Sequence, residues 1–251
     1  MSTFNSPTYP TRHGYMTEDI QRKFIVWAID RGLLPRDAHR MAPVIALEAA
    51  NDAAKPIQPW QLFSVLGPDR IIAIVRDFYG RVFADEPWFT TVFARVGPLE
   101  HHVMTQAAMW VDVMGGGPAY HGAEFRLNFH HTHNAMELMT DRGARRWTEL
   151  MVQTLDASGP HMTDDPRVRP ALNTFLAYFM GKYAQEFAFE DKYAFGALNP
   201  PLRRKLNFMA MTSEAIEALG EEELRAALTE RGVDTSAYPE KADLVNKAQM
   251  L

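Results

Sequence analysis

Apolar residues recur at helical spacing along most of the chain, and the strict alternation that marks strands is absent. Two such stretches, residues 17–31 and 36–53, predict helices, and Pro56 and Pro59 end the second pattern. We expect residues 1–59 to form a helical N-terminal extension that packs on the domain that follows.

The middle of the chain, residues 60–190, shows a succession of helical patterns. Helices are expected over about residues 69–83, 98–113, 141–155 and 166–187. Asp69 can cap the first of these helices, and the glycines at 115–117 end the second. The segment 120–139 has the least regular pattern. The predicted fold class is all-α.

Residues 191–212 are expected to be a linker, and residues 213–251 an acidic segment of short amphipathic helices. The acidic segment holds nine acidic and four basic residues, which accounts for the whole net charge of −5. Phosphate binding needs a basic surface, so nucleic acid is not an expected partner. The string EELRAALTERGVDTSAYPEKADLV resembles SAP-like helical modules, and its acidity favours a protein contact or a capping role over DNA binding.

The composition also bears on location. No run of eighteen apolar residues occurs, so no membrane-spanning helix is expected, and the first residues lack the apolar stretch of a secretory signal. The chain has no cysteine, and nothing in it argues for export. A cytoplasmic location is expected.

Six of the nine histidines fall between positions 101 and 133 and end in the run His130-His131-Thr132-His133. Neutral imidazole is a frequent ligand for iron, copper, zinc and nickel, and a chain without cysteine must hold such a metal through imidazole, carboxylate or a cofactor. Each histidine taken alone is better explained as a solvated surface residue than as a metal ligand. The cluster as a whole keeps a metal site open.

Three strings in the middle of the chain match one known family. They are IIAIVRDFYGRVFADEPWFTTVF, QAAMWVDVMGGGPAYHG and RRWTELM, in this order and at nearly the family spacing. Over residues 66–189 the chain resembles the truncated haemoglobins, or 2-over-2 globins, and in particular the group with a tryptophan in the distal pocket. The resemblance implies a truncated-globin-like helical core between the two extensions.

The resemblance also implies that the chain binds haem b, with one proximal histidine on the iron. His133 stands thirteen residues beyond Tyr120, as the family spacing requires, and it is the expected ligand; His131 and His130 are the alternatives. Counting back from Trp147 reaches Asn134 instead, so the chain carries one extra residue between the ligand and the tryptophan.

On the distal side of the haem, the family pattern implies hydrogen-bond donors for a bound gas. The candidates are Tyr79, His102 (or His101), Gln106 and Trp147. The residues implied to pack on the haem or to meet its propionates are Phe78, Phe93, Tyr120, Arg126 and His130. Bound dioxygen takes on partial negative charge, and each donor contributes about 0.5–1.5 kcal/mol. Slow release, or redox chemistry on dioxygen, nitric oxide or peroxide, is therefore favoured over simple transport.

Two other functions stay open beside a haem globin. A helical non-haem metalloenzyme would use several of the clustered histidines, although the chain has neither the Glu-x-x-His nor the His-Glu-x-x-His pattern. A globin-fold sensor or interaction protein would act through the two extensions, by a homodimer contact or a partner protein. The expected small partners are a diatomic gas or peroxide, with a reductase if the protein is a haem-dependent oxidoreductase.

Overall fold

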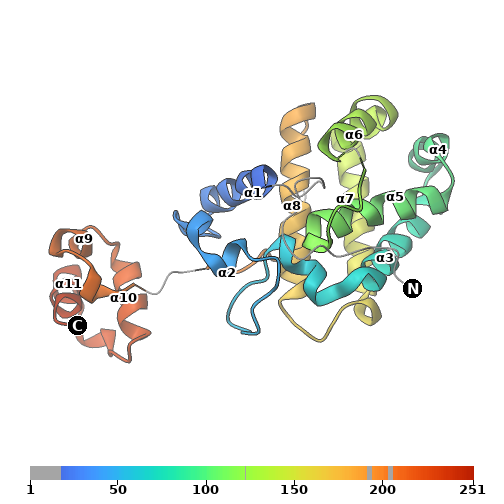
Figure 1. Ribbon diagram of the computed structural model, residues 1–251. Coiled ribbons are helices and arrows are strands. Elements are labelled where there is room, and N and C mark those ends of the chain that lie inside the picture. The colour runs from blue at the N-terminus through green and yellow to red at the C-terminus, as the bar shows by residue number, and fades with distance from the viewer. Residues whose placement is uncertain (1–17, 122, 191–193, 203–205) are drawn as a thin grey trace. The chain divides into compact units, whose positions relative to one another are not determined.

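The computed structural model describes residues 18–121, 123–190, 194–202 and 206–251 (Figure 1). Every regular element within these ranges is helical, which confirms the all-α prediction. The chain divides into two compact units, Met1–Leu202 and Arg203–Leu251, and each has a hydrophobic core of its own.

The larger unit begins with the helix α1 (Glu18–Asp30), which agrees with the expectation for residues 17–31. The second expected helix, over residues 36–53, is wrong. The structure has only the short turns η1 (Ala38–Arg40) and α2 (Ala42–Ile45) there, and Ala46 is already extended, with ψ 149°. Pro43 stands in the first turn of α2, where a proline without an N–H is tolerated.

The extension is joined to the main body by aromatic packing. Phe24 of α1 contacts the rings of Trp60 and Tyr178, with ring centroids 5.2 Å and 5.0 Å apart. The Trp60 indole Nε1 donates a hydrogen bond to the Val44 carbonyl at 2.8 Å. The extension therefore shares the hydrophobic core of the larger unit.

The helices that follow form the body of the larger unit. In chain order they are η2 (Pro59–Gln61), α3 (Leu62–Phe83), α4 (Pro87–Val96), α5 (Leu99–Val111), α6 (Ala123–Phe129), α7 (Asp141–Ala157), η6 (Gly159–His161) and α8 (Val168–Phe187). The helix α3 starts at Leu62, earlier than the expected residue 69. It is kinked at Gly67, whose φ of 68° suits glycine, just before Pro68. Beyond the kink, α3 packs on α5, α7 and α8 and is central to the core.

Two π-helical turns interrupt the middle of this unit. The turn η3 (Asp112–Gly116) ends α5, and Gly115 there has a φ of 94°, where a side chain would collide with the Trp60 carbonyl. The turn η4 (His130–Asn134) continues α6 and is followed by the 3-10 turn η5 (Met136–Leu138). The segment that lacked a regular pattern is thus a series of short helical pieces. π-Helical turns occur frequently at functional sites.

The helices of the smaller unit are η7 (Phe208–Ala210), α9 (Ser213–Glu217), α10 (Glu221–Thr229), η8 (Thr235–Ala237) and α11 (Lys241–Gln249). They confirm the short helices expected over residues 213–251. Its core includes Leu224, Leu228 and Leu244, which are fully buried. The Arg225 guanidinium donates to the Thr235 and Pro239 carbonyls at 3.0 Å and 2.8 Å and fixes the loop between α10 and α11. Across both units, no helix in the described ranges has the length and apolar character needed to cross a bilayer.

Candidate functional site

A cavity lies inside the larger unit and is enclosed mainly by α3, α4, α5, α6, α7 and α8. It encloses about 850 Å³ between the atoms, counting its open end. Most of its wall is apolar. The polar or hydrogen-bonding side chains in the wall are Tyr79, Gln106, His130, His131, Trp147 and Tyr183. A mostly apolar cavity with a few polar groups is typical of a cofactor or small-molecule site.

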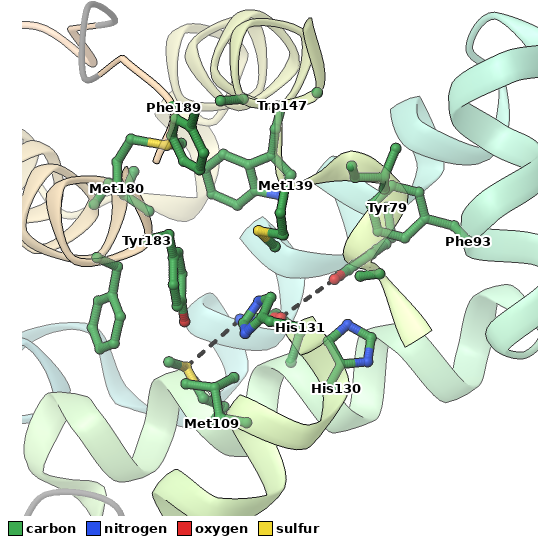
Figure 2. Close-up of a pocket in the computed structure, with 18 of the residues that line it drawn as sticks. Tyr79, Phe93, Met109, His130, His131, Met139, Trp147, Met180, Tyr183 and Phe189 are labelled. Carbon is green, nitrogen blue, oxygen red and sulfur yellow. Dashed lines mark hydrogen bonds between the residues drawn. The ribbon is translucent and has the colours of Figure 1, made fainter. Parts of the chain in front are cut away.

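Tyr79 reaches this cavity from α3 and is almost fully buried. Its hydroxyl donates to Gln106 Oε1 at 3.3 Å, and Gln106 Nε2 contacts the Met109 sulfur at 3.6 Å (Figure 2). Burial raises the pKa of Tyr79 well above its ordinary value, and repulsion from the ionised form of Tyr120 adds to this. The phenol therefore keeps its proton and remains a hydrogen-bond donor.

Trp147 enters the cavity from α7 (Figure 2). Its ring packs on Phe78, with centroids 4.9 Å apart, and on Phe195, at 6.0 Å. The neighbouring Arg146 Nε donates to Asp85 Oδ2 at 2.8 Å, and this bond ties α7 to the residues just after α3. Arg146 lowers the pKa of the Asp85 carboxyl, which stays ionised and holds the guanidinium. The position of Trp147 is thus fixed by its two ring contacts and by the hydrogen bond of the neighbouring Arg146.

His131 is half-buried in the wall of this cavity. Its ring lies 4.3 Å from that of Tyr183, and its Nδ1 is buried without a hydrogen-bond partner. Burial lowers the pKa of His131 to about 3 and that of the adjacent His130 to about 4. Both imidazoles are neutral at pH 7, which is the form that binds a metal.

His133, the expected ligand, lies outside the cavity. It is exposed and stacks on Phe129 at 4.2 Å, with its Nδ1 2.8 Å from Thr132 Oγ1. Residues two positions apart on a helix point about half a turn away from each other. Because His131 faces inward, His133 faces outward, and the structure does not bring it to the other site residues.

His102 is buried behind Tyr79, and it does not line the cavity itself. The two rings stack with centroids 5.3 Å apart, and His102 Nε2 lies 2.8 Å from the Phe93 carbonyl oxygen. Burial lowers the pKa of His102, so it is expected to be neutral. The geometry makes His102 a support for Tyr79. Phe78 is likewise a buried support, in ring contact with Tyr79 and Trp147, while Phe93 lies in the cavity wall.

A second cavity adjoins the first and is more polar. The two share part of their walls, namely Tyr79, Gln106, Met109, Leu127 and His130. The second, about 680 Å³ by the same measure, adds His101, His102, Tyr120 and Arg126, and Arg126 lies over the Tyr120 ring at 4.8 Å. The joined space thus has an apolar end and a basic end.

This combination fits haem, which has an apolar macrocycle and two carboxylates. The buried, unpartnered ring nitrogen and the neutral state of His131 fit an axial ligand, and Arg126 fits a propionate. Among the described residues, no three His, Cys, Asp or Glu side chains gather closely enough to hold a metal ion by themselves. This part of the chain therefore offers a metal single imidazoles, and a bound haem would supply the other ligands.

The sequence interpretation missed several residues of the cavity wall. They include Met139, Met180, Tyr183 and Phe189. In the pattern of α8, Tyr183 and Met180 belong to the apolar face and look like ordinary core. The one signal that could have identified Tyr183 is its hydroxyl on an otherwise apolar helix face, because a tyrosine hydroxyl needs a hydrogen-bond partner when it is buried.

Comparison with known proteins gives the family. The model for the bacterial-like globins matches residues 61–180. Group 2 truncated hemoglobin 3-1 of Lotus japonicus is 32% identical over 127 residues, which span 49% of this chain and 73% of that protein. The chain belongs to the truncated, or 2-on-2, globin family.

This truncated globin also matches Two-on-two hemoglobin-3 of Arabidopsis thaliana, at 33% identity over 98 residues, 39% of this chain and 55% of that protein. No solved structure matches it. Membership indicates haem-based binding of a gaseous ligand. The match to the family covers most of the helices around both cavities, up to residue 180 in α8, and both extensions lie outside it. The SAP-like resemblance and the distal role of Trp147 stay predictions.

Proposed function

We propose that this truncated globin binds haem b in the joined cavities, where His131, in place of His133, would bind the iron. The observation that carries the proposal is the position of one neutral imidazole, with its Nδ1 buried, in the same cavity as the phenol of Tyr79. When bound, haem would supply an iron that can take up a diatomic gas or peroxide. The basic end of the space, with Arg126, would receive the propionates.

The donors in the wall favour retention of the ligand over rapid exchange. The Tyr79 hydroxyl is held by Gln106 at 3.3 Å, which is long for an O–H donor, so the hydroxyl can turn to a ligand at little cost. The Trp147 side chain reaches the same cavity. Two neutral hydrogen bonds of about 0.5–1.5 kcal/mol each would slow release by a factor of about 5 to 150. Slow release favours redox chemistry on dioxygen, nitric oxide or peroxide, supported by a reductase.

An absorption spectrum of the purified protein tests the haem assignment first. An intense band near the violet edge is expected, and its absence would favour a non-haem metal protein. His131→Ala should then lose haem or require added imidazole to keep it, while His133→Ala should leave the spectrum unchanged. The reverse pattern would return the ligand to His133. A cytoplasmic location stays part of this proposal and is tested by cell fractionation.

A sensor that acts through the N-terminal extension is the second candidate function. Glu124 of α6, the helix that leads into His131, accepts a hydrogen bond from Lys182 of α8 at 2.9 Å. Its other oxygen lies 3.8 Å from the ammonium of Lys23 on α1. The N-terminal extension is therefore in electrostatic contact with α6, which we call the proximal helix because it leads into His131. A change in haem ligation on deleting α1 would favour this function.

A further inference from the structure

A row of aromatic rings joins the first cavity to a half-buried tryptophan at the surface. Trp88, the second residue of α4, contacts the ring of Phe89, with centroids 5.3 Å apart, and Phe89 contacts Phe93 at 5.1 Å. Phe93 in turn contacts Tyr79 at 5.9 Å (Figure 2). Phe89, Phe93 and Tyr79 line the cavity. These four residues, the aromatic row, therefore connect the proposed haem site with the surface.

The indole of Trp88 donates to a carboxylate. Its Nε1 donates a hydrogen bond to Glu86 Oε2 at 2.6 Å, a charge-assisted bond. Within the described ranges, no other tryptophan has such a partner. Trp60 donates to the Val44 carbonyl, and the buried Nε1 of Trp27 has no partner. The carboxylate of Glu86 can accept the indole proton when the ring loses an electron.

A positive charge lies over the same ring. The guanidinium carbon of Arg142, in the first turn of α7, is 3.8 Å from the ring centroid of Trp88. A cation at this distance stabilises the neutral ring and opposes a second positive charge beside it. The indole must therefore lose its proton together with the electron. Because Glu86 accepts that proton, the ring passes from one uncharged form to another.

Tyr79, at the inner end of the aromatic row, lacks a base of this kind. Its hydroxyl donates to the side-chain amide of Gln106, which does not take up a proton in neutral water. Loss of an electron from Tyr79 would leave a positive charge in a mostly apolar cavity, which is costly. An electron deficit created in the cavity is therefore more stable on Trp88 than on Tyr79.

We propose that Trp88 and Glu86 form a surface oxidation site, at which the protein takes electrons from phenols that do not enter the cavity. The inference rests on the proposed haem function, with peroxide as the ligand. One electron leaves Trp88 for the haem through the aromatic row, and the indole proton passes to Glu86. A phenol then gives one electron to Trp88, Glu86 returns the proton to the indole, and the phenolic proton goes to water.

The electrons and atoms balance over two such transfers. The O–O bond of one peroxide breaks as it takes up two electrons from Trp88 and two protons from water, which gives two water molecules. Two phenols lose one electron and one proton each and become phenoxyl radicals. No further oxidant or reductant is needed.

A phenol suits this site by its chemistry. It is oxidised by loss of one electron and one proton, and it gives up this pair more easily than an indole does in neutral water, so transfer to Trp88 is favourable. The exposed guanidinium of Arg142 can also donate a hydrogen bond to the phenol oxygen.

A spectroscopic experiment tests the site without any phenol. Full-length, ferric, haem-loaded protein is mixed with hydrogen peroxide, frozen within seconds and measured by electron paramagnetic resonance. A tryptophan radical is expected, identified by the change of its signal in protein made with ring-deuterated tryptophan. Trp88→Phe should lose this signal. Glu86→Gln keeps an acceptor for the hydrogen bond but cannot take up the proton, and it should lose the signal as well.

Trp27→Phe is the matched control. Trp27 is also a half-buried tryptophan with an arginine over its ring, Arg31 at 4.3 Å, but its Nε1 has no carboxylate partner. This variant should keep the radical signal. Because Trp27, Glu86 and Trp88 do not line the cavity, the haem spectrum of each variant should change with peroxide at the original rate.

A phenol tethered to dextran gives a second readout, because the polymer cannot enter the cavity. The protein should oxidise the tethered phenol with peroxide, and so should Trp27→Phe, whereas Trp88→Phe and Glu86→Gln should lose this reaction. Equal oxidation by Trp88→Phe, or a tryptophan radical that persists in that variant, overturns the surface site. A radical that persists in Glu86→Gln overturns the role of the carboxylate.

The haem spectrum of each protein is recorded first and separates the two proposals. A protein that takes up no haem refutes the proposed function and the surface site with it. A haem-loaded protein that consumes peroxide without forming a radical on Trp88, or that does not react with peroxide, refutes the surface site and leaves the haem assignment intact.

Discussion

Tyr79→Phe removes a single hydroxyl from the cavity and leaves the ring in place. The ring contacts to Phe78 and His102, at 5.2 Å and 5.3 Å, should persist. The hydrogen bond that is lost, to Gln106, is long at 3.3 Å. We therefore expect the free energy of unfolding to change by less than about 1 kcal/mol, so that effects on ligand binding are read in a folded protein.

The expected effect on dioxygen follows from the same bond. A neutral hydrogen bond between the Tyr79 hydroxyl and the ligand contributes about 0.5–1.5 kcal/mol, which corresponds to a factor of about 2 to 13 in the equilibrium constant. Most of this factor should appear in the dissociation rate. Bound carbon monoxide carries less negative charge than bound dioxygen and accepts a weaker hydrogen bond. The dissociation rate of carbon monoxide should therefore change by less than about twofold.

Stopped-flow displacement on the ferrous, haem-loaded protein measures both rates. Tyr178→Phe is the matched control, because Tyr178 is also buried but lies on α8 outside both cavities, and neither rate should change. If Trp147 donates to the same ligand, Tyr79→Phe combined with Trp147→Phe should deviate from simple addition. Equal acceleration of both gases would indicate steric gating, and no change in either would refute the distal role of Tyr79.

Three further predictions concern stability and the extensions. Asp85→Asn should lower the free energy of unfolding at pH 7 by about 1.5–3 kcal/mol. Because Arg146 lowers the pKa of Asp85, this stabilisation is present above the ordinary carboxyl pKa of about 4 and is lost as the pH falls through the lowered pKa of the folded protein. The unfolding free energies of the two proteins should therefore converge in acid. A constant difference at every pH would contradict the assignment. Glu124→Gln should speed haem transfer to apomyoglobin by up to about fivefold, with the exposed Glu186→Gln as control, and equal rates would deny the link between α1 and the proximal helix. Deletion of residues 213–251 should leave the haem spectrum unchanged, and loss of haem would mean that this segment helps to build the pocket.

Long amphipathic helices were predictable because their pattern runs over several turns. The expected helices 141–155 and 166–187 correspond closely to α7 and α8. The helix expected over 36–53 failed because that apolar stretch has Pro43 and no sustained period, so its residues are buried by an irregular chain. Helical propensity there is overridden by packing on Trp60.

The proximal ligand shows why the site was harder to predict than the fold. Counting from Tyr120 reaches His133, and counting back from Trp147 reaches Asn134, so the two counts already disagreed by one residue. Counting along the sequence assumes a constant helical pitch. The π-helical turn at His130–Asn134 breaks this assumption, and the imidazole that faces inward is His131. The roles of Tyr79 and of the other residues in the cavity wall stay predictions.

The division after Leu202 bears on the cooperativity of unfolding. Leu224 and Leu244 are buried in a core that is separate from the core around Phe78 and Trp110. Two separate cores need not melt together, and a chain of this kind departs from two-state behaviour. Because haem binds only the larger unit in our assignment, mass action would raise the melting temperature of one transition and leave the other in place. A single Tm would then describe neither unit, and calorimetric scans with and without haem would identify which transition belongs to the globin.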